Sequence, residues 1–254
     1  MDEELLYRKI QEALEKIPEN FNVLEEQIDV QLQMEYFKFA RKFRKGKEVN
    51  RLTAQKARLF DPEVTPLVKK KILVSLASSV EVESFRTIEK YLLDPDPGLK
   101  DWAILALQES RMLLQSSLLD EQQIFISTGL GGKGQKLRYF VVFLNNEGKE
   151  LSGMQKKLLQ DELKFVVEKN EGEVEEFTEM LDYSSAVVIL PLKAALKDIF
   201  RGIIDECNQY GNFLQDDMVI TNVKRLNPVE IVEILNQQKA GEETGDMGPE
   251  EDPD

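Results

Sequence analysis

An internal repeat constrains the fold of this chain more than any other feature of its sequence. The segment Leu59-Phe60-Asp61-Pro62 returns 33 positions later as Leu92-Leu93-Asp94-Pro95, and each copy precedes a run with helical periodicity. The match continues past the turn, because apolar positions in 68–76 correspond to positions in 99–107 at an offset of 31. Such a tandem repeat is typical of helical hairpins that bury their apolar faces by stacking on their neighbours.

The second copy resembles a known repeat family. Residues 92–107, Leu-Leu-Asp-Pro-Asp-Pro-Gly-Leu-Lys-Asp-Trp-Ala-Ile-Leu-Ala-Leu, are similar to the HEAT repeat family in the inter-helix turn and the second helix. The resemblance covers about residues 52–117. It implies a platform of stacked helices that binds another macromolecule, and it implies no chemistry. A helical bundle that is not a solenoid is the alternative.

Two further helices are predicted ahead of the repeat. Apolar residues recur with a 3.6-residue period from Asp2 to Lys16, and Pro18 ends this run. Asn22 can cap a second helix, whose apolar stripe continues until Gly46. We therefore expect residues 1–118 to form a helical, HEAT-like domain.

The second half of the chain has a different residue pattern, with runs of β-branched and aromatic residues that predict strands. These predicted strands are 124–126, 137–144, 186–192 and 218–223. Helices are predicted over 151–169 and 194–209, and Pro228 opens a last one. The segment 173–181 suits either a helix or a hairpin strand, and we favour the strand.

The order of elements from residue 137 onward is then βαββαβ, the pattern of a ferredoxin-like α/β sandwich. The predicted fold class is α+β, with this sandwich over residues 119–238. Two nearly continuous apolar runs suit its central strands, and the Glu-rich strand suits an edge, where charge discourages aggregation. The strand at 124–128 is an extra N-terminal one, which either attaches at an edge or indicates another strand order.

The composition excludes several kinds of chemistry. The 254 residues contain no histidine, and Cys207 is the only cysteine, which excludes zinc sites and Ser-His or Cys-His nucleophiles. We predict no catalytic residue, metal site or cofactor, so the sequence favours a protein that is not an enzyme. Carboxylate chemistry with magnesium stays open. Cys207 shares a helical face with apolar residues, which predicts a core position rather than a reactive thiol.

The charge of the chain is unevenly distributed. The formal net charge is −14, and the tail 239–254 holds seven acids against one base. This tail is rich in Gly and Pro and is predicted to be disordered. Because the first residues are acidic and no apolar run approaches the roughly 20 residues of a membrane span, we expect a cytoplasmic protein without membrane contact.

A basic run is the most unusual local feature of this acidic sequence. Between Lys38 and Arg58 there are nine basic residues and one acid, with phenylalanines interleaved. Such a face can bind nucleic-acid phosphates or an acidic partner. The alternative is that the cations complement a helix C-terminus and remain solvated. The predicted partner- or anion-binding residues are Lys38, Arg41, Lys42, Arg44, Lys45, Lys47, Arg51, Lys69, Lys70 and Lys71.

A glycine-rich loop is the other candidate site. Its backbone could approach a phosphate, and its cations could meet the phosphate charge. It lacks the Gly-Lys-Ser/Thr sequence leading into a helix that a P-loop needs, so a flexible turn is the simpler interpretation. The residues of this candidate ligand loop are Gly129, Gly131, Gly132, Lys133, Gly134 and Lys136.

Three functions follow from these features. The leading expectation is a non-enzymatic adaptor or regulatory protein that binds a protein partner through the HEAT-like platform. The alternative is an RNA-binding protein that uses the basic face of residues 38–71, with the acidic tail contacting the same face and competing for it. The third is a small-ligand sensor built around the glycine-rich loop.

Overall fold

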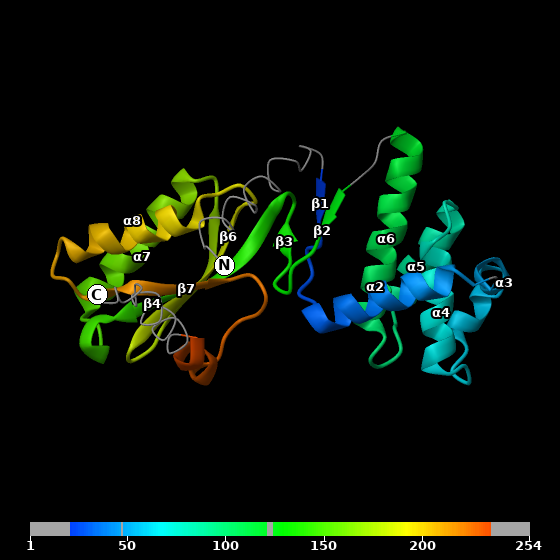
Figure 1. Ribbon diagram of the computed structural model, residues 1–254, viewed down its shortest axis with the longest axis horizontal. Helices are drawn as coiled ribbons and strands as arrows, with labels where there is room; N and C mark the ends of the chain where they lie inside the picture. Colours follow the sequence, from blue (N-terminus) through cyan, green and yellow to red (C-terminus); the bar gives the residue numbers. More distant parts are fainter. Residues whose placement is uncertain (1–20, 47, 121–123, 235–254) are drawn as a thin grey trace, which may run out of the picture. The chain divides into compact units, whose positions relative to one another are not determined.

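The computed structural model describes residues 21–46, 48–120 and 124–234, which belong to two compact units divided between Gln135 and Lys136 (Figure 1). The first unit is mainly helical, and the second combines helices with an antiparallel sheet. The chain is therefore α+β, as predicted. The predicted helix at 2–16 and the acidic tail 239–254 lie outside the described residues.

The first unit contains the internal repeat. Its elements are β1 (Phe21–Val23), α2 (Val30–Arg44), α3 (Val49–Thr53), the 3₁₀ helix η1 (Lys56–Phe60), α4 (Pro66–Ala77), α5 (Val82–Leu92), α6 (Lys100–Leu119), β2 (Ile124–Ile126) and β3 (Gly132–Lys133). Both Asp-Pro segments lie in turns that lead into a long helix, α4 in the first copy and α6 in the second.

The start of α2 differs from the prediction. The helix begins at Val30, because the Asp29 carboxylate accepts hydrogen bonds from the backbone N–H groups of Gln31 and Leu32 at 2.9 and 3.1 Å. Asn22, the predicted cap, lies instead within the strand β1. Asp29 provides the same capping chemistry seven residues later.

The strand at 124–126 also differs from the prediction. We expected it to join the sheet of the sandwich, but β2 pairs in parallel with β1, matching Phe21 to Ile124 and Val23 to Ile126. The pair is a separate two-stranded sheet of the first unit. The two compact units divide between Gln135 and Lys136, whereas the sequence predicts a domain boundary between residues 118 and 119.

An ion pair connects the two copies of the repeat. Lys69 of α4 donates from Nζ to both carboxylate oxygens of Asp96, at 2.6 and 2.8 Å, and the Tyr91 hydroxyl donates to the same carboxylate at 2.6 Å. The Lys69 side chain is only 3% exposed. The hydrogen bond from Lys69, followed by that from Tyr91, holds the pKa of Asp96 below its ordinary value.

The second unit is a sheet with two helices packed on it. Its elements are β4 (Lys136–Asn145), the 3₁₀ helix η2 (Asn146–Gly148), α7 (Gly153–Lys169), β5 (Glu173–Glu179), β6 (Tyr183–Pro191), α8 (Leu196–Asn208) and β7 (Leu214–Thr221). A helical turn over 228–234 follows, with the Asn227 side chain accepting hydrogen bonds from two of its first N–H groups.

The strands of this unit are antiparallel, in the order β7-β4-β6-β5. The two apolar strands β4 and β6 are central and buried along nearly their whole length. The segment 173–181 contains the edge strand β5, which confirms the choice of a strand. Helices α7 and α8 pack against each other beside the sheet (Figure 1).

The single cysteine is a core residue of the second unit, as predicted. Cys207 lies on the buried face of α8 together with Phe200, Ile203 and Ile204. Burial, and next the nearby Glu162 and Glu206 carboxylates, raise the pKa of its thiol to about 12. The thiol is therefore protonated and unreactive at neutral pH.

The pair between Lys69 and Asp96 makes a testable contribution to stability. Asp96→Asn leaves the buried ammonium of Lys69 without its counter-charge, so we expect the free energy of unfolding at pH 7 to fall by about 2 kcal/mol. Because the folded-state pKa of Asp96 is depressed, its contribution is present above the unfolded pKa and is lost as pH falls through the folded one. The difference between wild type and variant should therefore shrink below about pH 4.

Urea denaturation at pH 7 and at pH 3 measures both effects. Asp94→Asn is the matched control, since Asp94 lies in the same turn, is exposed, and has no side-chain partner among the described residues. We expect the control to change stability by less than about 0.5 kcal/mol. Equal losses in the two variants would contradict a structural role for the pair.

Candidate functional site

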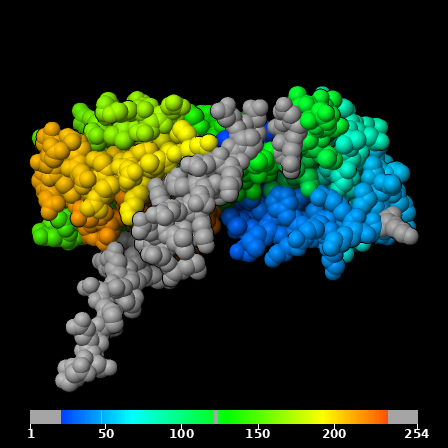
Figure 2. Space-filling model, turned by 45° about the horizontal axis from the view of Figure 1, so that its top comes forward, coloured from blue at the N-terminus to red at the C-terminus, as the bar shows by residue number. Residues whose placement is uncertain are grey.

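Four cations of the predicted basic run form one exposed stripe on α2. Lys38, Arg41, Lys42 and Lys45, here called the basic stripe, lie at helical intervals of three and four residues and are all exposed. None of the four has an ion pair with any described residue. The surface of α2 is visible in blue in Figure 2.

Two large apolar side chains lie on the same face of α2. Met34 is 45% exposed and Phe37 is 41% exposed, and both continue the helical spacing of the basic stripe. The Phe37 ring meets the buried Tyr36 ring edge to face, with 5.3 Å between the centroids. Cations and an exposed aromatic ring therefore share one helix surface about 16 Å long.

Glu109 of α6 holds α2 against α6 through two side chains of α2, one buried and one at the edge of the exposed face. The Tyr36 hydroxyl donates to Glu109 Oε2 at 2.7 Å, and the Arg44 guanidinium forms an ion pair with the same oxygen. Burial, and next the Glu109 charge, raise the pKa of Tyr36 well above its ordinary value, so the phenol remains a neutral donor. The Glu109 side chain is only 12% exposed.

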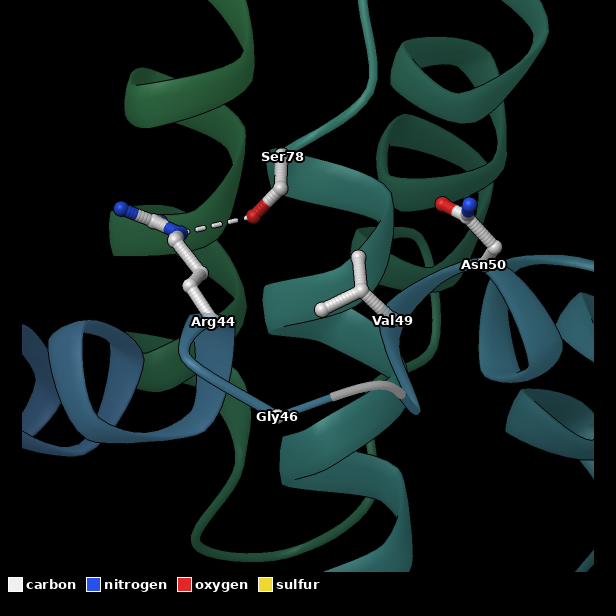
Figure 3. A pocket seen from close by; sticks show the side chains of 5 residues that line it. All are labelled: Arg44, Gly46, Val49, Asn50 and Ser78. Carbon is white, nitrogen blue, oxygen red and sulfur yellow. Dashed lines mark hydrogen bonds between the residues drawn. The ribbon is translucent and has the colours of Figure 1, made fainter.

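A shallow cleft opens where α2 ends (Figure 3). It has a volume of about 390 Å³ and is lined by Arg44, Gly46, Val49, Asn50 and Ser78. Arg44 Nε donates to Ser78 Oγ at 2.8 Å, and Ser78 Oγ donates in turn to the carbonyl of Val74 at 2.7 Å. The Asn50 carboxamide is exposed and has no hydrogen bond to any other described residue.

The remaining residues of the predicted basic face are engaged with acids. Arg51 pairs with Glu48 at 3.0 Å, and Lys71 lies 3.8 Å from the same side chain. Lys70 pairs with Glu35 at 3.1 Å and lies over the Trp102 ring at 3.9 Å. Lys47 lies outside the described residues.

Lys69 does not belong to an exposed basic face. Its side chain is buried in the pair with Asp96 described above, where a phosphate cannot reach it without breaking that pair. The structure therefore separates the predicted set into an exposed stripe on α2 and a group of cations with structural partners.

The glycine-rich loop is packed against the chain itself. At Gly131, with φ +67°, a Cβ would lie 2.5 Å from the carbonyl oxygen of Glu25, so no larger residue fits. The Gly134 N–H donates to the Glu25 carboxylate at 3.0 Å, Leu130 is buried, and Lys136 donates to the carbonyl of Glu171. Gly129, Gly132 and Lys133 complete this turn. Chain packing accounts for the glycine at position 131, and a positive φ of +60° accounts for Gly134, which has open space around it.

Other kinds of site are not found in the part of the chain that the structure describes. Residues 21–46, 48–120 and 124–234 contain no group of three or more His, Cys, Asp or Glu side chains placed to hold a metal ion. No described helix has the length and apolarity needed to cross a membrane. The aromatic residues Tyr139 and Phe143 of β4 are buried, so this strand presents no aromatic ring on its surface.

The cleft could not be found from the sequence. Asn50 and Ser78 are 28 positions apart, and only the packing of α3 beside α4 brings them to one cleft. The pairing of Arg44 with Glu109 is equally non-local. Phe37, by contrast, was visible as an aromatic residue within the basic run.

Comparisons with known proteins give structural neighbours but no family. No protein-family model matches the chain, and no curated protein matches it. Among solved structures, it is similar to a candidate transposase from Deinococcus radiodurans R1, with 17% identity, a TM-score of 0.32, and coverage of 44% of this chain and 93% of the other. It is also similar to a REP-associated tyrosine transposase bound to a REP hairpin, with 16% identity, a TM-score of 0.30, and coverage of 42% and 69%.

These comparisons correct the leading functional expectation. The two solved structures named above are described as transposases rather than repeat adaptors, which contradicts the expectation of a HEAT-repeat adaptor that binds a protein partner. At these identities and TM-scores, no residue role is transferred from the neighbours to this chain.

The division of the cations into bound and free ones has a measurable consequence. Arg44→Ala removes the cation beside the largely buried Glu109, so we expect the free energy of unfolding to fall by about 1–2 kcal/mol. Lys42→Ala removes an exposed cation without a partner among the described residues, and should change stability by less than about 0.5 kcal/mol. Urea denaturation of both variants measures the difference, and indistinguishable midpoints would refute the division.

Proposed function

We propose that this protein binds nucleic acid through the basic stripe of α2. The observation that carries the proposal is the stripe itself: Lys38, Arg41, Lys42 and Lys45 share one exposed helix face without an acidic partner among the described residues. A row of free cations at helical spacing is the arrangement that tracks a phosphate backbone.

The helix dipole alone is a weak explanation for this stripe. A helix C-terminus carries about half a negative charge, whereas the stripe holds four full positive charges. Arg44, which also lies in the last turn of α2, already complements this end of the helix. The stripe therefore leaves a net positive surface within a chain of net charge −14.

We assign the nucleic-acid binding site to the first unit rather than to the sheet of the second unit. Proteins that read RNA on a sheet use exposed aromatic rings on its central strands. The aromatic residues of β4 are buried, and burial raises the pKa of Tyr139 to about 12. Exposed Phe37 instead lies beside the cations of α2.

Two finer assignments of fold are also part of the proposal. The first unit is HEAT-like over about residues 52–117, supported by the recurrence of an Asp-Pro turn before α4 and before α6. The second unit is a ferredoxin-like sandwich, supported by the strand order β7-β4-β6-β5 around the connections βαββαβ. We propose these units as the framework that presents α2.

Charge reversal tests the proposed function. The change is Lys38→Glu, Arg41→Glu, Lys42→Glu and Lys45→Glu together, and the measurement is fluorescence anisotropy with a labelled single-stranded oligonucleotide. Four phosphate contacts, at about 0.7 counterion each, predict that wild-type affinity falls about 50-fold when salt is raised fourfold. The reversed variant should lose both the binding and this salt dependence.

A matched control separates the stripe from net charge. Lys157, Lys164, Lys193 and Lys197 of the second unit are exposed and have no ion pair with any described residue. Reversing these four to Glu changes the net charge by the same amount and should leave most of the binding intact. Equal losses in the two variants, or no wild-type binding at low salt, would overturn the proposal.

A further inference from the structure

The cleft at the end of α2 has the composition of a site for a small planar group. Its volume of about 390 Å³ falls within the range of ligand pockets, which is about 300–1,000 Å³. Its lining combines an apolar side chain, Val49, with the guanidinium of Arg44, the amide of Asn50 and the hydroxyl of Ser78 (Figure 3). An apolar surface with a few polar groups binds and orients such a ligand.

Arg44 enters this cleft with a fixed orientation. Its Nε donates to Ser78 Oγ at 2.8 Å, while its other end pairs with the Glu109 carboxylate. Both contacts lie in the plane of the guanidinium, so they limit its rotation and do not themselves occupy its flat faces. A guanidinium face is a surface on which nucleic-acid bases stack.

Asn50 supplies the group that can read a base edge. Its carboxamide carries a donor and an acceptor side by side, which matches the paired donors and acceptors on base edges. The Asn50 carboxamide is exposed and makes no hydrogen bond to another described residue, so its N–H donor and its oxygen acceptor are both available to a ligand. Its partner must then come from outside the described chain or from solvent.

Phe37 adds a second stacking surface at a suitable separation. Phe37 and Arg44 are seven residues apart on α2, which is two helical turns, so they lie on the same edge of the exposed face. The corresponding rise is about 10 Å. Three residues of the basic stripe, Lys38, Arg41 and Lys42, lie between these two positions in the sequence and can hold the phosphates that connect the stacked bases.

We propose that the cleft receives an unpaired base of a single-stranded nucleic acid, which stacks on Arg44 and is read by Asn50 while a neighbouring base stacks on Phe37. A duplex keeps its bases paired and stacked inside, so it can engage the basic stripe but neither of these two surfaces. The inference rests on the proposed binding of nucleic acid and assigns its substrate class. Asn50 is the specificity-determining residue.

The experiment compares single strands with duplexes of the same sequence, in DNA and in RNA, by fluorescence anisotropy at fixed salt. The variants are Asn50→Ala and Phe37→Leu, both at exposed positions of the intact chain. Each should weaken single-strand binding about tenfold. Duplex binding should change by less than twofold, and Asn50→Ala should also flatten differences in affinity among homopolymers.

The control is Gln31→Ala, which removes another exposed amide from α2, about 20 Å along the helix from Arg44. It should leave single-strand and duplex binding unchanged. A single-strand advantage in the DNA arm or the RNA arm that Asn50→Ala and Phe37→Leu reduce supports the inference and identifies the sugar that the site accepts.

Two other outcomes overturn the inference and are distinguishable from each other. If single strands and duplexes bind equally and neither variant matters, the cleft is not a base site, although binding through the basic stripe stands. If the wild-type chain binds none of the four nucleic acids at low salt, the proposed function and the inference fail together.

Discussion

The surface of α2 depends on one carboxylate. Glu109 of α6 accepts the hydroxyl of Tyr36 and pairs with the guanidinium of Arg44, two points that lie two turns apart on α2. Two attachments at that spacing hold both the position of the helix and its rotation about its own axis. The rotation decides which side chains face solvent, and hence that the four cations share a face with Phe37. Without Glu109, Arg44 would also lose the partner that holds its guanidinium plane beside Ser78.

Ion pairs between distant segments explain why the basic face was only partly visible in the sequence. The nine cations between Lys38 and Arg58 could be counted directly, and their periodicity on a helix was apparent. Their acidic partners could not be identified from the sequence, because they belong to other helices. Glu83 of α5 reaches Lys56, and Glu109 of α6 reaches Arg44, only through the packing of these helices. Lys69 is the clearest case: a lysine within a run of three looks exposed, yet it is buried against Asp96 of the other repeat copy.

The prediction of the fold succeeded where the sequence signal is local. It failed where strands far apart in the sequence pair with each other. The repeat helices and the strands β4 and β6 carry periodic or continuous apolar patterns, and the structure has them. The pattern of residues 173–181 suits either a helix or a strand. The position of this segment after a long helix favours a strand, and the structure has the strand β5 there. The pairing of β1 with β2 joins segments about 100 residues apart, so nothing near Asn22 indicates a strand. Asn22 and Asp29 have equivalent capping chemistry, and sequence alone does not rank them.

The buried position of Cys207 allows selective labelling of a cysteine that is introduced elsewhere in the chain. Because this single thiol is fully buried and protonated, a cysteine introduced at an exposed position would be the one that a maleimide dye labels in the native state. A fluorophore could thus be placed on either unit without removing the native cysteine from the core of α8. The same thiol becomes reactive when the second unit opens, so its labelling rate reports on local unfolding there, independently of any signal from the helices of the first unit.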